Sequence, residues 1–347
     1  MILIHKKPSR LSKGDTVAIV SPSWGGPSVF PHVYEKGLKV LREWGLKIKE
    51  FPTARMDATF TRANPQVRAK DINDAFADPE VKAVFASIGG DDSVRILPFL
   101  DKKIIAENPK ILMGYSDTST LHVFANLQGL VSFYGPSIMA GFSQMGSLPE
   151  SFKSHVREML FEPKESYEYR SYQKYCDGYP DWANKENIGK VNQLKSDDGW
   201  HWLQGRDKVQ GELFGGCIEV LEMMKATDFW PSQDFWKGKI FFLETSEEKP
   251  TIRYIDHVLR NYGMLGVYGK ISGFIFSRAR NYSDEEKKEL EEKIVSIVAK
   301  EFDKPNLPIV ANFDVGHTDP QLVLPIGVKA EIDCENKKIK LTESWLR

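Results

Sequence analysis

The sequence predicts an α/β fold with an N-terminal, doubly wound and mostly parallel sheet and a smaller C-terminal α/β domain with a mixed sheet. Short apolar runs rich in β-branched residues alternate with amphipathic stretches of helical period. Loops containing glycine follow several of these runs. The same alternation starts again at Gly211, after a long polar segment, and the 347 residues are enough for two domains.

In the first half, apolar runs predict strands, and stretches with apolar residues three or four positions apart predict helices. The predicted strands are residues 16–20, 46–51, 81–88 and 111–113. The predicted helices are residues 30–44, 65–77 and 118–127. Because strands and helices alternate, we expect parallel strands, with ligands bound beyond their carboxyl ends.

The second half shows the same pattern. The predicted strands are residues 239–243, 270–276 and 308–313, followed by hairpin strands within residues 321–341. The predicted helices are residues 218–224, 252–262 and 284–302, of which the last is strongly charged. Glu244 and the loop at residues 314–320 therefore follow the ends of buried strands.

A segment of different composition separates the two halves. Residues 166–205 have little periodicity and carry tyrosines and tryptophans among polar residues, which is typical of a binding loop. The predicted domains are therefore residues 1–165 and 206–347, joined by this segment. Trp182 within it either stacks on a planar ligand such as a nucleobase or packs the loop against the body of the protein.

Composition excludes several classes of function. The net charge of -1 disfavours nucleic-acid binding, and no apolar run is long enough for a membrane span. The N-terminal residues lack the features of a signal peptide, so we expect a cytoplasmic protein. Cys176, Cys217 and Cys334 lie far apart and form no metal-binding pair, and no dinucleotide or P-loop motif is present. We therefore expect no metal and no cofactor.

Gly114-Tyr115-Ser116-Asp117 lies between a predicted strand and a predicted helix. A serine in such a tight turn exposes its hydroxyl, and the first amides of the helix point toward any negative charge that forms there. The pattern suits a nucleophile, although Thr118 occupies the position of the last glycine in Gly-x-Ser-x-Gly. The alternative is that Ser116 or Asp117 only caps the helix.

Gly89-Gly90 follows another predicted strand of the same sheet. Glycine lets a reacting carbonyl approach the backbone closely, so an amide here could stabilise an oxyanion. The alternative is a tight turn in which Asp91 or Ser93 caps the next helix.

A serine nucleophile needs a base and a group that orients that base. Of the seven histidines, His317 lies directly after a predicted strand, in a loop that also contains glycine and aspartate. Glu244, which ends its own strand, is the candidate for the orienting carboxylate. Asp314 and Asp319 are alternatives because they are close to His317 in the sequence.

Ordered sequence blocks along nearly the whole chain resemble the LD-carboxypeptidase family of serine peptidases, in particular its microcin C self-immunity branch. The blocks are Gly14-Asp15, Val20-Ser21-Pro22-Ser23, Ile88 to Ser93, Asn108 to Asp117, Tyr134-Gly135-Pro136, Gly211 to Gly216, Phe242-Leu243-Glu244, Gly316-His317-Thr318 and Leu324 to Gly327. The resemblance implies a triad of Ser116, Glu244 and His317 at the junction of two domains. It also implies oxyanion amides at Gly90 and Asp117.

The resemblance further implies that Trp182 stacks on the adenine of the substrate, and we expect Gly89 and Asp91 to contact the substrate as well. The expected activity is cleavage of the amide between an acidic aminoacyl group and a nucleotide-like moiety, by a protein that is commonly a homodimer. One alternative is a carboxypeptidase acting on murein tetrapeptides. Another is a ligand-binding α/β protein without enzymatic activity.

Overall fold

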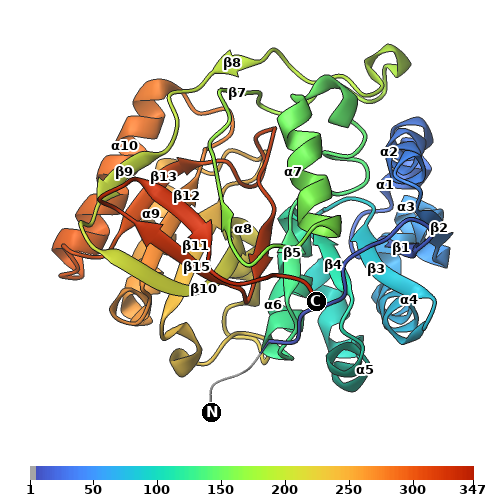
Figure 1. The fold of residues 1–347 in the computed structure, drawn as a ribbon, viewed down its shortest axis with the longest axis horizontal. Coiled ribbons are helices and arrows are strands. Elements are labelled where there is room, and N and C mark those ends of the chain that lie inside the picture. Colours follow the sequence, from blue (N-terminus) through green and yellow to red (C-terminus); the bar gives the residue numbers. More distant parts are fainter. Residues whose placement is uncertain (1–4) are drawn as a thin grey trace.

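Two β-sheets organise the computed structural model, which describes residues 5–347 (Figure 1). Residues 1–4, part of the N-terminal stretch predicted to lack a signal peptide, lie outside the described residues. The first sheet is mostly parallel and the second is mixed. The predicted α/β class is therefore confirmed.

The first sheet has six strands in the order β14-β5-β4-β3-β1-β2. Its strands are β1 (Thr16–Val20), β2 (Lys47–Glu50), β3 (Val81–Ala86), β4 (Ile111–Gly114), β5 (Ser132–Tyr134) and β14 (Leu324–Ile326). The helices of this half are α1 (Gly26–Val29), α2 (Pro31–Glu43), α3 (Ala58–Ala63), α4 (Pro65–Ala77), α5 (Lys102–Glu107), α6 (Ser119–Leu127) and α7 (Glu150–Phe161). Since β3 and β4 are parallel neighbours, the loops that follow them lie side by side.

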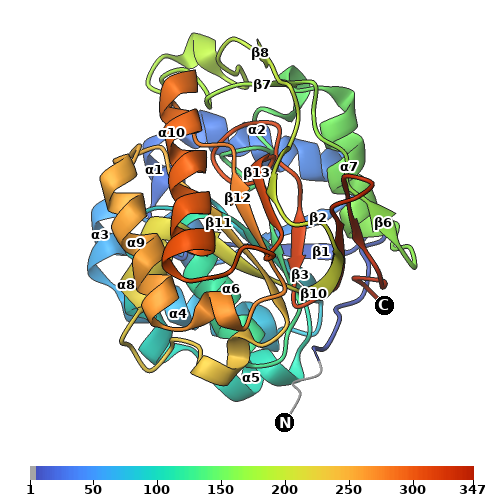
Figure 2. The same cartoon turned by 90° about the vertical axis from the view of Figure 1, so that its left-hand side faces the viewer.

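The second sheet has eight strands in the order β6-β16-β15-β10-β11-β12-β13-β9. Its strands are β6 (Tyr167–Glu168), β9 (His201–Gln204), β10 (Lys208–Cys217), β11 (Lys239–Glu244), β12 (Gly273–Ser277), β13 (Ile309–Phe313), β15 (Lys329–Asp333) and β16 (Lys338–Leu341). Its helices are α8 (Ile218–Met224), α9 (Ile252–Met264) and α10 (Asp284–Val295), and Figure 2 shows α9 and α10 in front of the central strands. Within residues 5–347, no helix combines the length and apolar character needed to cross a membrane.

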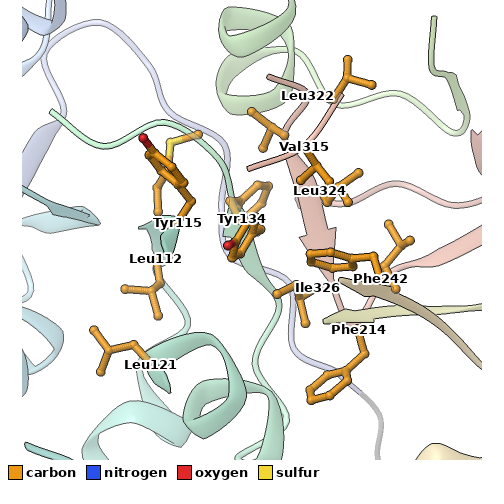
Figure 3. Close-up of a cluster of buried hydrophobic side chains, with 14 of the residues drawn as sticks. Leu112, Tyr115, Leu121, Tyr134, Phe214, Phe242, Val315, Leu322, Leu324 and Ile326 are labelled. Carbon is orange, nitrogen blue, oxygen red and sulfur yellow. The ribbon is translucent and has the colours of Figure 1, made fainter. Parts of the chain in front are cut away.

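The prediction of hairpin strands at residues 321–341 is wrong for the first of them. β15 and β16 do form an antiparallel hairpin, but β14 pairs with β5 at the edge of the first sheet. All three residues of β14 are buried. Figure 3 shows Leu324 and Ile326 beside Tyr134 of the first sheet and Phe242 of the second, whose rings contact each other with centroids 5.3 Å apart. The apolar seam between the sheets therefore holds this strand in place.

The aromatic-rich segment contributes to the second sheet as well as forming a loop. β6 pairs with β16, and β9 pairs with β13. Its remaining strands, β7 (Lys174–Tyr175) and β8 (Lys195–Ser196), pair with each other in a separate two-stranded sheet. The division into residues 1–165, 166–205 and 206–347 stays a prediction.

A buried ionic network attaches this segment to the sheet. The Arg278 guanidinium follows β12 and lies 2.6 Å from both the Asp197 and the Asp314 carboxylates, and all three side chains are almost completely buried. Trp200 donates its indole N–H to the second oxygen of Asp314 at 2.8 Å. The network thus joins the middle segment to the loops that follow β12 and β13.

We expect Arg278→Met to lower the free energy of unfolding by about 3 to 5 kcal/mol, because it leaves two buried carboxylates without their cation. Urea unfolding followed by circular dichroism measures the change. The matched control is Arg42→Met, which removes an exposed pair with Glu35 and should cost about 1 kcal/mol or less. Equal losses in the two variants would contradict the prediction.

Candidate active site

Ser116 lies in a strained turn directly after β4. Its φ is +61°, and it begins the single 3-10 turn Ser116–Thr118 that leads into α6. Positive φ is rare for residues other than glycine, and such strain is typical of functional sites. The alternative role as a helix cap is not observed, because no side chain caps this turn or α6. Asp117 instead accepts hydrogen bonds from the amides of Asp92 and Ser93.

The Gly89-Gly90 backbone lies directly against Ser116. A Cβ added to Gly89 would be 3.0 Å from the Ser116 Oγ, so no larger residue fits without disturbing the hydroxyl. Gly90 has φ +146°, and a Cβ there would be 2.3 Å from the Ser23 Oγ. The side chain of Asp91, by contrast, is exposed and pairs with Arg62 at 3.2 Å. Glycine is therefore required beside the serine, whereas Asp91 points to the surface.

Glu244 and His317 form a buried pair at the ends of β11 and β13. The His317 Nδ1 lies 2.7 Å from the Glu244 Oε2, and Glu244 is completely buried. Gly316 has φ +90°, and a Cβ there would be 2.3 Å from this carboxylate oxygen. The alternative Asp314 is engaged by Arg278 and Trp200. Of the candidate carboxylates, Glu244 is thus the one that holds the Nδ1 side of the ring.

Tyr134, at the end of β5, connects this pair to the serine turn. Its hydroxyl donates to the Glu244 Oε1 at 2.5 Å and accepts from the backbone N–H of Ser116 at 3.1 Å. Sequence reasoning assigned Tyr134 no role. The Tyr-Gly-Pro block was the available signal, but the contact depends on β5 and β11 meeting across the two sheets.

The other ring nitrogen of His317 faces Glu247, a second residue that sequence reasoning missed. The Nε2 lies 3.0 Å from the Glu247 Oε2, and within residues 5–347 no hydrogen bond joins it to Ser116. Ser116 and His317 nevertheless line one pocket of about 210 Å³, and the His317 ring packs on Tyr115 at 5.0 Å between centroids. The structure therefore brings the two residues to one pocket, with Glu247 bound to the imidazole.

The charge state of His317 follows from these neighbours. Burial lowers the pKa of the imidazole, but the carboxylates of Glu244 and Glu247 more than offset this effect and raise the pKa to about 10. Burial raises the pKa of the Glu247 carboxyl, but the hydrogen bond to His317 and the positive charge of that ring together outweigh this effect and lower the pKa to about 2. At neutral pH the ring is therefore an imidazolium between two carboxylates.

Trp182 lines the same pocket. One face of its indole stacks on Tyr179, with centroids 4.7 Å apart and an angle of 13° between the planes. Its carbonyl accepts a hydrogen bond from the His32 Nε2 at 2.8 Å. Trp182 thus both packs the middle segment onto α2 and lines the pocket, so the two alternatives for this residue do not exclude each other.

The ligand atoms of Cys217, Glu244 and His317 lie close enough together to hold a metal ion. However, burial raises the pKa of the Cys217 thiol well above its usual value, and the thiol donates to Glu219 at 3.2 Å. Thiolate, not thiol, is the metal ligand, and Glu244 already occupies the His317 Nδ1. The donor set is therefore better suited to proton transfer than to metal binding.

A positive-φ serine after a parallel strand, beside glycine amides and a buried histidine–carboxylate pair, is typical of serine hydrolases. The chain also matches two family models, the LD-carboxypeptidase N-terminal domain over residues 17–135 and the LD-carboxypeptidase C-terminal domain over residues 210–332. The protein belongs to the LD-carboxypeptidase family of peptidases.

Similar proteins cover nearly the whole chain. The microcin C7 self-immunity protein MccF of Escherichia coli is 27% identical over 97% of this chain and 95% of its own. A probable murein peptide carboxypeptidase of Bacillus subtilis is 26% identical over 96% of this chain and 93% of its own. The solved structure of MccF in complex with aspartyl sulfamoyl adenosine is 28% identical, with a TM-score of 0.86 over 99% of this chain and 100% of that chain.

Proposed function

We propose that this protein is a serine carboxypeptidase-type hydrolase that cleaves the amide between an acidic aminoacyl group and a nucleotide-like moiety. The main support is one pocket that contains Ser116, His317 and an indole, Trp182. Similarity to MccF, which binds aspartyl sulfamoyl adenosine, supports the substrate class. The biological result would be the destruction of a toxic aminoacyl-nucleotide.

In the proposed mechanism the Ser116 Oγ attacks the carbonyl carbon while the His317 Nε2 takes the hydroxyl proton. Glu244 holds the Nδ1 side of the ring and stabilises the imidazolium that forms. The tetrahedral oxyanion lies against the backbone amides of Gly90 and Asp117, each worth about 3 kcal/mol in such sites. His317 then protonates the leaving amine, and water hydrolyses the acyl-enzyme. Before the first step, Glu247 must leave the Nε2 and the imidazolium must lose its Nε2 proton, so that the neutral nitrogen can act as the base.

A comparison of substrates tests this function. The purified protein is incubated with aspartyl sulfamoyl adenosine and, separately, with a murein tetrapeptide, and the products are identified by mass spectrometry. We expect release of aspartate from the first compound. Cleavage of the tetrapeptide alone would overturn the proposal in favour of murein peptide hydrolysis, which the similarity to the Bacillus subtilis protein supports as the second candidate.

We expect Trp182→Ala to lower kcat/KM for aspartyl sulfamoyl adenosine by roughly 10- to 100-fold, because stacking on a base is worth about 1 to 3 kcal/mol. Trp182→Phe should retain most of the activity. Steady-state kinetics with both variants measures the effect, and Trp230→Ala, outside the pocket lining, is the control for loss of an aromatic side chain. A Trp182→Ala enzyme with unchanged kcat/KM would exclude stacking.

We further propose that the protein is a homodimer and acts in the cytoplasm. Both proposals rest on the family resemblance and the composition of the chain. Size-exclusion chromatography with light scattering tests the first, and fractionation of cells that express the protein tests the second.

A further inference from the structure

Arg280 lies in the loop after β12 and lines the pocket that contains Ser116 and His317. Within residues 5–347 its guanidinium has no carboxylate at ion-pair distance, and its Nε is buried without a hydrogen-bond partner. A buried charged donor that lacks a partner is unfavourable unless a ligand supplies the acceptor. The pocket therefore presents a cation that the fold itself does not neutralise.

Two arginines among the described residues, Arg68 and Arg278, are fully buried, and both are paired. Arg68 donates to the Asp92 carboxylate at 2.9 Å and to the Pro22 carbonyl at 2.8 Å. Arg278, two positions before Arg280, lies between two carboxylates. Arg280 differs from both because its guanidinium faces the catalytic pocket instead of a structural carboxylate.

Two acidic residues near Arg280 do not take the place of a ligand. The Glu247 carboxylate is hydrogen-bonded to His317, and Asp319 is completely enclosed, with a pKa that burial raises to about 6. Neither forms an ion pair with Arg280 in the described part of the chain. The Tyr179 ring lies 6.0 Å from the guanidinium carbon and can support its charge through a cation–π contact.

We propose that Arg280 binds a carboxylate of the substrate and thereby sets the preference of the enzyme for acidic compounds. The inference rests on the proposed function and specifies the group that the pocket recognises. A guanidinium fork matches a carboxylate through two parallel hydrogen bonds. The carboxylate could belong to the side chain of an acidic aminoacyl group or to the free C-terminus of a peptide.

Two matched pairs of compounds distinguish these sources. The first pair is aspartyl and asparaginyl sulfamoyl adenosine, and the second is a murein tetrapeptide and its C-terminal carboxamide. For each pair, the measured quantity is kcat/KM for the acid divided by kcat/KM for the matching amide. We expect Arg280→Gln to lower this acid-over-amide ratio by roughly 10- to 100-fold in the pair whose carboxylate Arg280 binds. Arg280→Lys, which keeps the charge but loses the fork, should give an intermediate ratio. The control is Arg253→Gln, which removes an exposed arginine at the start of α9.

An acid-over-amide ratio equal to that of the wild type in both pairs would overturn the inference. Calorimetric binding of the same compounds to Ser116→Ala and to Ser116→Ala/Arg280→Gln gives a readout that does not depend on turnover. If the wild type cleaves neither acid, the proposed function fails. The ratio of the two binding affinities, acid over amide, then still shows whether Arg280 binds the carboxylate. If Arg280→Gln does not fold, the acid-over-amide ratio of the Arg280→Lys variant tests the inference in its place.

Discussion

Replacement of Ser116 by alanine should reduce kcat by roughly 10⁴-fold or more, because loss of a serine nucleophile removes the covalent step. The fold should persist, since within residues 5–347 the Ser116 hydroxyl makes no hydrogen bond. Its backbone N–H still donates to Tyr134 in the variant. Product release from aspartyl sulfamoyl adenosine measures activity, and urea unfolding measures stability.

The control for this variant is Ser151→Ala, which removes an exposed hydroxyl on α7 and should change neither quantity. Mass spectrometry of the wild type, quenched during turnover, should detect an acyl group on the peptide that contains Ser116. Wild-type turnover by Ser116→Ala would exclude the mechanism. Loss of activity together with loss of folding would instead make Ser116 a structural residue of the turn.

The second large effect concerns pH. His317 acts as a base only when its ring is neutral, and the pKa of this ring is raised to about 10. Because the neutral fraction grows as the pH rises toward this pKa, kcat/KM of the wild type should rise with pH through the neutral and alkaline range. Glu247→Gln removes one of the two carboxylates and should lower this pKa. At pH 7 kcat/KM should then increase roughly tenfold for each unit by which the pKa falls.

The profile of kcat should respond less than that of kcat/KM. The pH dependence of kcat reports the pKa values of the enzyme–substrate complex, in which Glu247 has already left the imidazole. The pH dependence of kcat/KM reports the pKa values of the free enzyme. The matched control is Glu248→Gln, which removes the same charge from the neighbouring exposed position. A Glu247→Gln profile identical to that of the wild type would show that Glu247 does not hold His317 in its charged form. A fall in kcat/KM at every pH would assign Glu247 to substrate binding instead.

Local patterns were sufficient to predict most strands and helices. The predicted helix at residues 65–77 coincides with α4, and the predicted strand at residues 239–243 lies within β11. The predicted helix at residues 284–302 is α-helical only as far as Val295 and continues as π-helix to Glu301. Periodicity indicates a helical stretch but does not distinguish between these hydrogen-bond patterns.

For the site, local sequence identified the residues at strand ends. Ser116 follows β4 of the first sheet, whereas Glu244 and His317 lie at or beyond the carboxyl ends of β11 and β13 of the second sheet. In each sheet, neighbouring parallel strands bring such positions to one edge. Their catalytic roles stay predictions. The Tyr-Gly-Pro block included Tyr134 but did not indicate its role, because its contacts to Ser116 and Glu244 exist only where β5 of one sheet meets β11 of the other.

The amino-acid sequence by itself determined the α/β class, the order of most elements and the family, because these depend on periodicity, turns and ordered motifs. Only the tertiary structure decided that β14 joins the first sheet, that Glu247 is bound to His317 and that Arg280 remains without a carboxylate. The physical reason is that strand partners and ion pairs depend on which buried surfaces and charges meet in space, and residues far apart in the chain supply them.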